Sequence, residues 1–305
     1  MAKIRANGID IEYEVSGPAD GVPILLIHGF AQQLIAWPDE FVDGFAKAGL
    51  KVIRFDNRDT GLSRKWDGQI PDFGAVTAAA RERRKPDVPY FLRDMAADAA
   101  GLLDALGIAS AHILGASMGG MIAQLVALDH SANARSLIEI FTTTNDAGLP
   151  PSSAEAHQAL ITPPQANDRA SVIAHVLKSR RAYASTAYAA DDERAAERIG
   201  RAYDRCFYPE GALRHWAAIL ASPPRGKRLR ALKLPALVLH GTADTLLPPA
   251  HGRYIADCIP GAEYHEIEGW GHDIPQGVIP TLLGFVLPFV EKVDASSTTT
   301  RHGRA

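Results

Sequence analysis

The chain alternates between two kinds of hydrophobic pattern. Short continuous apolar runs, which are typical of strands buried on both faces of a sheet, are followed by segments with apolar residues at helical spacing. The expected strands lie at residues 23–27, 51–55, 113–114, 136–141, 235–241 and 264–267, and the expected helices at 37–48, 92–106, 121–128 and 279–293. This alternation predicts an α/β fold with a mostly parallel sheet and helices on both faces.

Two early segments depart from this alternation. Residues 3–15 alternate between apolar and polar positions around Asn7-Gly8, a pair that favours a two-residue turn. We therefore expect an antiparallel hairpin before the parallel strands. Residues 64–90 form an insertion that contains prolines and charges and shows no clear period.

The alternation stops after the expected strand at 136–141, which is the sixth strand when the two hairpin strands are counted. From residue 145 to 230 there is no strand-like run, and apolar residues recur at helical spacing: Val172, Ile173, Val176 and Leu177, then Leu213, Trp216, Ile219 and Leu220. A segment inserted there would lie above the carboxyl ends of the strands, where ligands bind in open α/β sheets. We therefore predict a core of residues 1–144 and 231–293, with a helical cap (a lid) at 145–230 that selects substrates without taking part in the chemistry.

Composition and charge narrow the class of protein. The chain has 305 residues, of which 47% are hydrophobic and 22% charged, with a formal net charge of −3. These values are ordinary for a globular protein and do not indicate a nucleic-acid or anionic-membrane binder. No run approaches the length of a membrane span and the first residues lack the apolar segment of a signal peptide, so we expect a cytoplasmic protein without stable membrane insertion.

Neither the cysteines nor the last residues indicate a further functional site. Cys206 and Cys258 are far apart and form no metal or redox motif, so we expect two reduced thiols. Residues 294–305 are rich in Ser, Thr and Arg without an apolar period, which predicts a disordered tail.

Residues 115–119 carry the strongest chemical signal. Gly115-Ala116-Ser117-Met118-Gly119 fits G-x-S-x-G, with an apolar run before it and a helical pattern after it. This strand–turn–helix context is that of a nucleophile elbow, in which the glycines relieve steric clash and the serine is exposed at a sharp turn. The alternative is an ordinary glycine-rich turn between a strand and a helix. We expect Ser117 to be a nucleophile.

A serine nucleophile needs a base and an acid, which on this topology follow it in the order Asp, His. Asp244 lies just past the strand at 235–241, and His272 just past the strand at 264–267. Both should therefore lie at the same sheet edge as Ser117. The alternatives are a turn or helix-capping aspartate and a surface-loop histidine. Asp146 is the reserve acid, His240, His251 and His265 are weaker candidates for the base, and His28 is better explained as a structural residue.

Two backbone N–H groups must also face the oxygen that becomes negatively charged. One is the amide of Met118, which follows the nucleophile. The other should come from the loop that follows the expected strand at 23–27, and we assign it to Phe30 in His28-Gly29-Phe30.

These residues, in this order, resemble the α/β-hydrolases over nearly the whole chain. Within that family, Asn57-Arg58-Asp59-Thr60-Gly61 and Trp37-Pro38-Asp39 look like the branch that contains the aclacinomycin methylesterase and related bacterial esterases. The resemblance implies the α/β-hydrolase fold, a catalytic triad of Ser117, Asp244 and His272, and hydrolysis of a small-molecule carboxylic ester through an acyl-enzyme.

Other functions remain open on the same residues. Relatives with this triad include cofactor-free perhydrolases of the haloperoxidase type, lactonases and C–C bond hydrolases, and a ligand-binding receptor could also use this fold. Serine at the elbow counts against the relatives that use an aspartate nucleophile, such as haloalkane dehalogenases. The expected chemistry calls for no metal and no organic cofactor. We expect no nucleic-acid partner, and the oligomeric state is left open.

Overall fold

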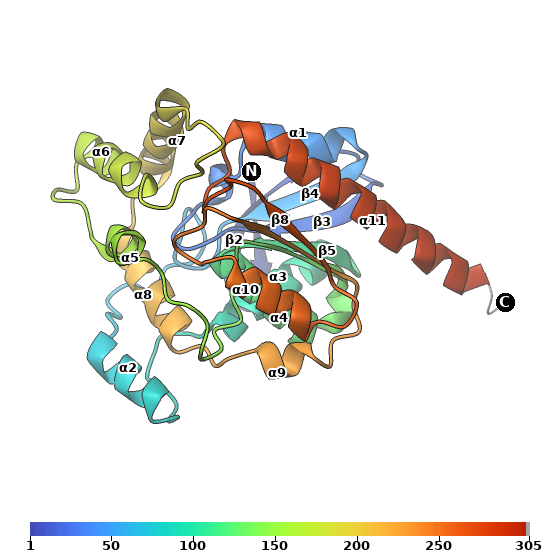
Figure 1. Ribbon diagram of the computed structural model, residues 1–305, viewed down its shortest axis with the longest axis horizontal. Coiled ribbons are helices and arrows are strands. Elements are labelled where there is room, and N and C mark those ends of the chain that lie inside the picture. The colour runs from blue at the N-terminus through green and yellow to red at the C-terminus, as the bar shows by residue number, and fades with distance from the viewer. Residues whose placement is uncertain (303–305) are drawn as a thin grey trace.

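A single sheet organises the molecule (Figure 1). The computed structural model describes the backbone of residues 1–302 and the side chains of residues 1–296. Over that part of the chain the sheet has eight strands in the order β1-β2-β4-β3-β5-β6-β7-β8. The strands are β1 (Ala2–Ala6), β2 (Ile9–Ser16), β3 (Val22–Ile27), β4 (Leu50–Phe55), β5 (Ala111–Ala116), β6 (Ala134–Ile140), β7 (Ala236–Gly241) and β8 (Glu263–Ile267).

The direction of the strands follows the prediction. β1 and β2 form the antiparallel hairpin, and Asn7 (φ 46°) and Gly8 (φ 74°) supply the left-handed backbone that its tight turn needs. β2 also runs antiparallel to β4, whereas every later neighbour pair, from β4–β3 to β7–β8, is parallel. The mostly parallel α/β sheet is confirmed.

Helices cover both faces of the sheet because alternate strand residues point to opposite sides. In β3, Leu25 packs in the core beneath α3 (Leu92–Ala105) and α4 (Met118–Asp129), whereas Leu26 packs in the core beneath α1 (Asp39–Lys47) and α11 (Ile279–His302). α10 (Ala250–Cys258) joins α3 and α4 on their face (Figure 1). A strand such as β3, which is buried on both faces, therefore contains a continuous apolar run.

α11 extends further than the hydrophobic pattern predicts. The apolar period ends at Val293, but the helix continues through residues 294–302, where we expect a disordered tail. Adding a turn to an existing helix needs no new nucleus and no apolar face. Asp294 is also held by an ion pair with Arg135, at 2.9 Å. The rest of the predicted tail, residues 303–305, lies outside the described residues.

The remaining helices lie mainly in the segment between β6 and β7, residues 145–230, which we call the cap. They are α5 (Ala154–Ile161), α6 (Arg169–Arg180), α7 (Asp192–Arg205), α8 (Pro209–Leu220) and the short α9 (Gly226–Leu229). α5 to α8 gather at one end of the sheet, at the left of Figure 1. The insertion at 64–90 contains α2 (Phe73–Arg81), which contacts α8. The structure also has three short 3-10 turns, at Leu34–Ala36, Ser131–Asn133 and Gln276–Val278.

The cap is fastened to the core by both buried and exposed ion pairs. Arg214 of α8 pairs with Asp59 at 2.8 Å, and both side chains are fully buried. Arg194 of α7, by contrast, pairs with Glu40 at 2.6 Å on the exposed surface. Among the described residues, no helix is both long and apolar enough to span a membrane.

Candidate active site

Ser117 sits on a backbone that few residues adopt. It follows β5 and precedes the first turn of α4, with φ 56° and ψ −122°. The turn brings backbones very close together: a Cβ on Gly115 would lie 2.2 Å from the Gly119 carbonyl oxygen, and one on Gly119 would lie 2.0 Å from the Ile27 oxygen. Only glycine fits at these two positions, and the positive φ of Ser117 turns its side chain out of the sheet.

Three side chains from different strand ends meet at this turn. His272, after β8, has its Nε2 atom 2.9 Å from the Ser117 Oγ. Its Nδ1 atom lies 2.7 Å from Oδ2 of Asp244, which follows β7. The structure thus brings together the three residues that the sequence singles out, although 155 positions separate Ser117 from His272.

Asp244 is buried and firmly oriented. Its Oδ1 atom accepts hydrogen bonds from the backbone N–H groups of Leu246 (2.9 Å) and Leu247 (2.8 Å), which leaves Oδ2 for His272. Burial by itself would raise the pKa of Asp244, but the adjacent His272 and His240 lower the pKa well below its ordinary range. The carboxylate is therefore charged at neutral pH, and it fixes the ring orientation of His272.

The loop that carries His272 is held from the cap. The His272 backbone N–H donates to the Tyr183 carbonyl oxygen at 2.7 Å. Ser185 Oγ accepts from the Gly271 N–H at 3.0 Å and donates to Asp273 Oδ1 at 2.5 Å. Sequence reasoning missed these contacts, because no local pattern connects residues 183–185 with a loop almost ninety positions later.

Phe30 and Met118 lie on the two sides of the serine. Met118 is the first residue of α4, and the Gly29–Phe30 loop approaches so closely that a Cβ on Gly29 would lie 3.2 Å from the Cβ of Ser117. Among the described residues, neither the Phe30 N–H nor the Met118 N–H donates a hydrogen bond to a protein acceptor. Two backbone donors beside a serine can stabilise an oxyanion.

The other candidates have other partners. Asp146 accepts from the backbone N–H of Gly226 at 2.8 Å and forms no hydrogen bond with His272. His28 accepts from the Gly29 N–H, and enclosure by the protein lowers the pKa of His28 to about 3, so it is neutral. The remaining histidines have other contacts. His240 contacts the Leu247 carbonyl and lies 3.4 Å from Asp244 Oδ2, His251 contacts Thr143 and the Pro150 carbonyl, and His265 stacks on the ring of Phe285.

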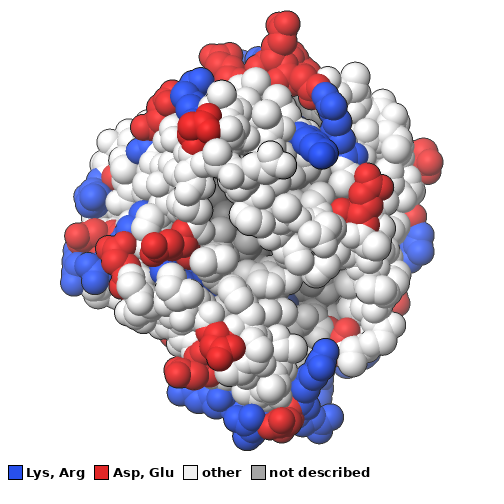
Figure 2. Space-filling model, turned by 90° about the vertical axis from the view of Figure 1, so that its left-hand side faces the viewer, with Lys and Arg blue, Asp and Glu red and all other residues white. Residues whose placement is uncertain are grey.

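A cavity of about 510 Å³ opens above Ser117 and His272. Core residues such as Phe30 and Met118 line one side, and Val176 of α6, Ile199 of α7 and Trp216 of α8 line the other. Figure 2 shows the cap face, which is hollowed at its centre among atoms of uncharged residues. The volume is that of a small-molecule site with apolar walls. Among the described residues, no three His, Cys, Asp or Glu side chains are grouped so that they could hold a metal ion.

The chain is similar in sequence to known hydrolases. The family model described as alpha/beta hydrolase fold matches residues 22–275. The rhodomycin D methylesterase DauP of Streptomyces sp. (strain C5) is 31% identical over 286 residues, which cover 87% of this chain and 89% of DauP. The putative carbamate hydrolase RutD of Variovorax paradoxus (strain S110) is 28% identical, covering 86% of this chain and 89% of that protein.

The fold also matches solved structures. The enol-lactonase from Burkholderia xenovorans LB400 superposes with a TM-score of 0.70 at 23% identity, covering 95% of this chain and all of that one. At that identity the likeness concerns the fold alone. It extends through the core and the cap together.

Proposed function

Because the chain belongs to the alpha/beta hydrolase fold family, we propose that it hydrolyses carboxylic esters with Ser117 as the nucleophile. The observation that carries the proposal is the continuous set of hydrogen bonds from Asp244 through His272 to the Ser117 Oγ, at 2.7 and 2.9 Å. The likeness to a rhodomycin D methylesterase supports ester hydrolysis, and it makes methyl esters of small molecules the first substrates to test.

Each group has a defined role in this reaction. The Ser117 Oγ attacks the ester carbonyl carbon while the His272 Nε2 takes the serine proton. The Phe30 and Met118 amides stabilise the negative oxygen, and Asp244 stabilises the imidazolium that forms. His272 then gives its proton to the leaving alcohol. Water, activated by the same histidine, releases the acid from Ser117.

The cavity supports a small-molecule ester rather than a polymer. Its walls are mostly apolar, and the scissile bond would lie at the floor, beside Ser117, with the cap above it. We further propose that the cap residues select substrates by the size and shape of the groups that they enclose. The cytoplasmic location and the absence of a nucleic-acid partner stay predictions.

A serine-reactive probe tests the assignment directly. We expect a fluorophosphonate to label the protein at Ser117, and labelling to disappear in Ser117→Ala. We also expect sustained release of nitrophenol from p-nitrophenyl acetate, and turnover within a panel of methyl esters of graded acyl size. Binding of these esters without sustained product would instead indicate a receptor, and labelling of Ser117→Ala would refute the nucleophile.

A further inference from the structure

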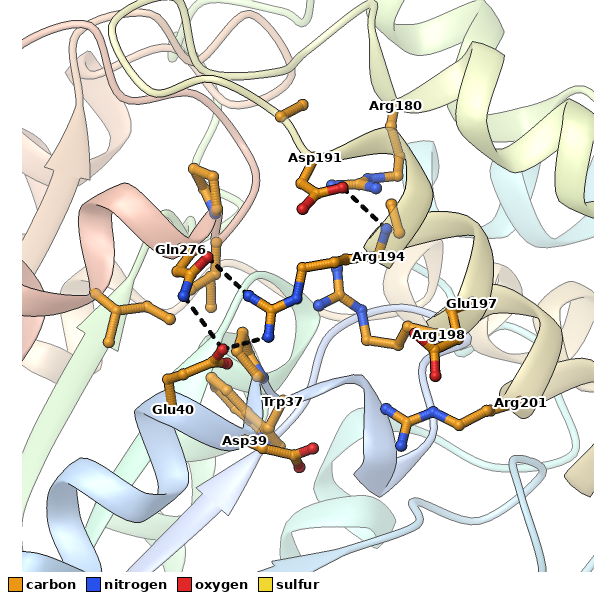
Figure 3. Close-up of a pocket in the computed structure, with 16 residues that line it drawn as sticks. Trp37, Asp39, Glu40, Arg180, Asp191, Arg194, Glu197, Arg198, Arg201 and Gln276 are labelled. Atoms are coloured by element: carbon orange, nitrogen blue, oxygen red, sulfur yellow. Dashed lines mark hydrogen bonds and ion pairs between the residues drawn. The ribbon is translucent and has the colours of Figure 1, made fainter.

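A second cavity adjoins the active-site cavity. A smaller cavity of about 210 Å³ lies between α7 and the core, and four residues line both cavities: Pro38, Arg180, Arg198 and Ile274. Figure 3 shows this second cavity, with arginines reaching into it from α7. A molecule bound over Ser117 can therefore meet two guanidinium groups at the boundary between the two spaces.

Arg198 differs from its neighbour on the same helix in having no partner. Arg194, one turn earlier, donates to Glu40 at 2.6 Å and to Gln276 at 2.7 Å. Arg198 is half-buried, and its guanidinium forms no hydrogen bond or ion pair with any described residue, nor does that of Arg180 at the end of α6 (Figure 3). A half-buried cation without a protein partner is stabilised when a ligand supplies the anion.

The nearby charges leave Arg198 without an ion pair among the described residues. Burial lowers its pKa, the positive charges of Arg180, Arg201 and Arg194 lower it further, and the carboxylate of Glu40 acts in the opposite direction. The acidic residues at the two cavities are engaged elsewhere or exposed: Glu40 bonds to Arg194, Asp39 lies 3.6 Å from Arg54, Asp191 caps α7, Asp146 accepts from Gly226, Asp273 accepts from Ser185, and Glu197 faces solvent.

Arg198 also lines the cavity that contains Ser117. His28, Phe30 and Ser117 line the same space, and the positive charge of Arg198 acts on His28. An anionic group of an ester bound at Ser117 can therefore reach Arg198 within this cavity.

We propose that Arg198, assisted by Arg180, binds a carboxylate of the substrate, so that the preferred substrates are esters that also carry a free carboxylate. This proposal rests on the proposed ester hydrolysis and names its substrate class. A carboxylate suits the site better than a phosphate dianion, because a single charge loses less hydration on entering apolar surroundings. A planar guanidinium also pairs with a carboxylate through two hydrogen bonds.

Matched esters test the proposal. Monomethyl esters of succinic to pimelic acid carry the carboxylate on the acyl side, and their dimethyl esters are the neutral partners. O-acetyl hydroxy acids and their amides form the corresponding pair for the alcohol side. The quantity measured is the ratio of kcat/KM for the charged ester to that for the neutral one. The series that shows the effect identifies the side of the ester that meets Arg198.

Replacing the arginines tests whether their positive charge produces the preference for the charged ester. We expect Arg198→Gln to lower the ratio by about ten- to a hundredfold, as for loss of a charge-assisted hydrogen bond, with little change on the neutral ester. Arg180→Gln should lower it less, and Arg198→Lys should keep part of it. Arg181→Gln is the matched control, since Arg181 adjoins Arg180 on the chain but is exposed and paired with Asp192; its ratio should equal that of the wild type.

The outcomes distinguish the two proposals. Hydrolysis of neither ester would count against ester hydrolysis itself. Hydrolysis of the neutral esters with the same ratio in the wild type and Arg198→Gln, in both series, would overturn the carboxylate site alone. A measurement on the wild type does not depend on the folding of a variant. Raising the ionic strength to about 1 M should lower the ratio of kcat/KM for the charged ester to that for the neutral ester, because salt screens the charge attraction. A ratio that salt leaves unchanged would also overturn the site.

Discussion

The core and the cap contribute different things to one cavity. In the core, Ser117, Asp244 and His272 each follow a strand of one rigid sheet, and their mutual distances are hydrogen-bonding distances. The cap contributes apolar walls and two arginines, Arg180 and Arg198, which have no hydrogen bond or ion pair with any described residue, and it holds no member of the proposed triad. This difference supports the proposal that the sheet carries the chemistry and that the inserted helices select the substrate.

The cap and the core are not independent, because cap residues bind the core loop that carries His272. The backbone N–H of His272 is bound by a carbonyl of the cap, and Ser185 bridges Gly271 and Asp273 on either side of it. The cap therefore lies above the substrate and also holds the loop that carries the histidine. The predictions below test how far chemistry and selection can be separated.

The largest effect is expected in the core. Ser117→Ala and His272→Ala should each lower kcat by about 10⁴-fold or more on every ester, because the triad acts as a unit. Steady-state kinetics on p-nitrophenyl acetate measure this loss, and circular dichroism controls for folding. If either variant kept activity within tenfold of the wild type, the replaced residue would not belong to the catalytic triad.

The acid should come next. Asp244→Asn keeps the shape of the side chain but removes the charge that stabilises the imidazolium, so we expect a loss of roughly 10³- to 10⁴-fold in kcat. Asp146→Asn is the matched control, since Asp146 lines the cavity but hydrogen-bonds to Gly226. If Asp146→Asn were inactive and Asp244→Asn active, the acid of the triad would be Asp146, after β6, and not Asp244, after β7.

A change in the cap wall should alter selection rather than rate. Trp216 of α8 stands edge-on to Phe30, with ring centroids 6.1 Å apart, and lines the cavity. Trp216→Ala should change the kcat/KM ratio between an octanoate and an acetate ester by about 10- to 200-fold, the range for one apolar contact. The acetate ester should remain a good substrate. Equal losses on both esters would show general damage, and an unchanged ratio would deny Trp216 this role.

The contact between the two regions should give a smaller effect on rate. Ser185→Ala removes the hydroxyl that holds the loop around His272, so we expect kcat to fall by about tenfold with KM nearly unchanged, the cost of one hydrogen bond. Ser179→Ala is the control, since the hydrogen bond of the Ser179 hydroxyl to a described residue is to His175, in its own helix α6. A change in KM alone would place Ser185 in substrate binding instead.

The smallest effect on activity is expected where the chain leaves the core for the cap. Burial raises the pKa of Glu139 on β6 to about 8, while Gln124 and Arg225 act against that shift. The folded state therefore holds a proton that the unfolded chain releases near pH 4.5, the ordinary value. The free energy of unfolding should fall between about pH 4.5 and 8, and fall less in Glu139→Gln, with kcat unchanged. Denaturant titrations at several pH values measure the difference. Identical slopes would show that Glu139 is ionised in the folded protein.

The sequence predicts the core much better than the cap contacts. The strands before Ser117 and Asp244 are mostly apolar and buried, and the short strand before His272 is half-buried. Because each candidate of the triad follows one of these strands, local patterns sufficed to bring Ser117, Asp244 and His272 to one edge. The unpaired state of Arg198 and the bond from His272 to Tyr183 depend on how the cap helices pack, which no local period encodes. The extension of α11 was missed for a related reason: helix growth from an existing turn needs no apolar period.

The bond between His272 and Tyr183 has a consequence for the evolution of this architecture. The cap enters after β6 and returns before β7, and these two strands are neighbours in the sheet, so the inserted segment could be exchanged without rerouting the chain. A new cap would still have to present a carbonyl to the His272 amide. Diversification of specificity should therefore proceed through α6, α7 and α8 more readily than through residues 183–185, which are the part of the insertion that a recombined enzyme must inherit intact.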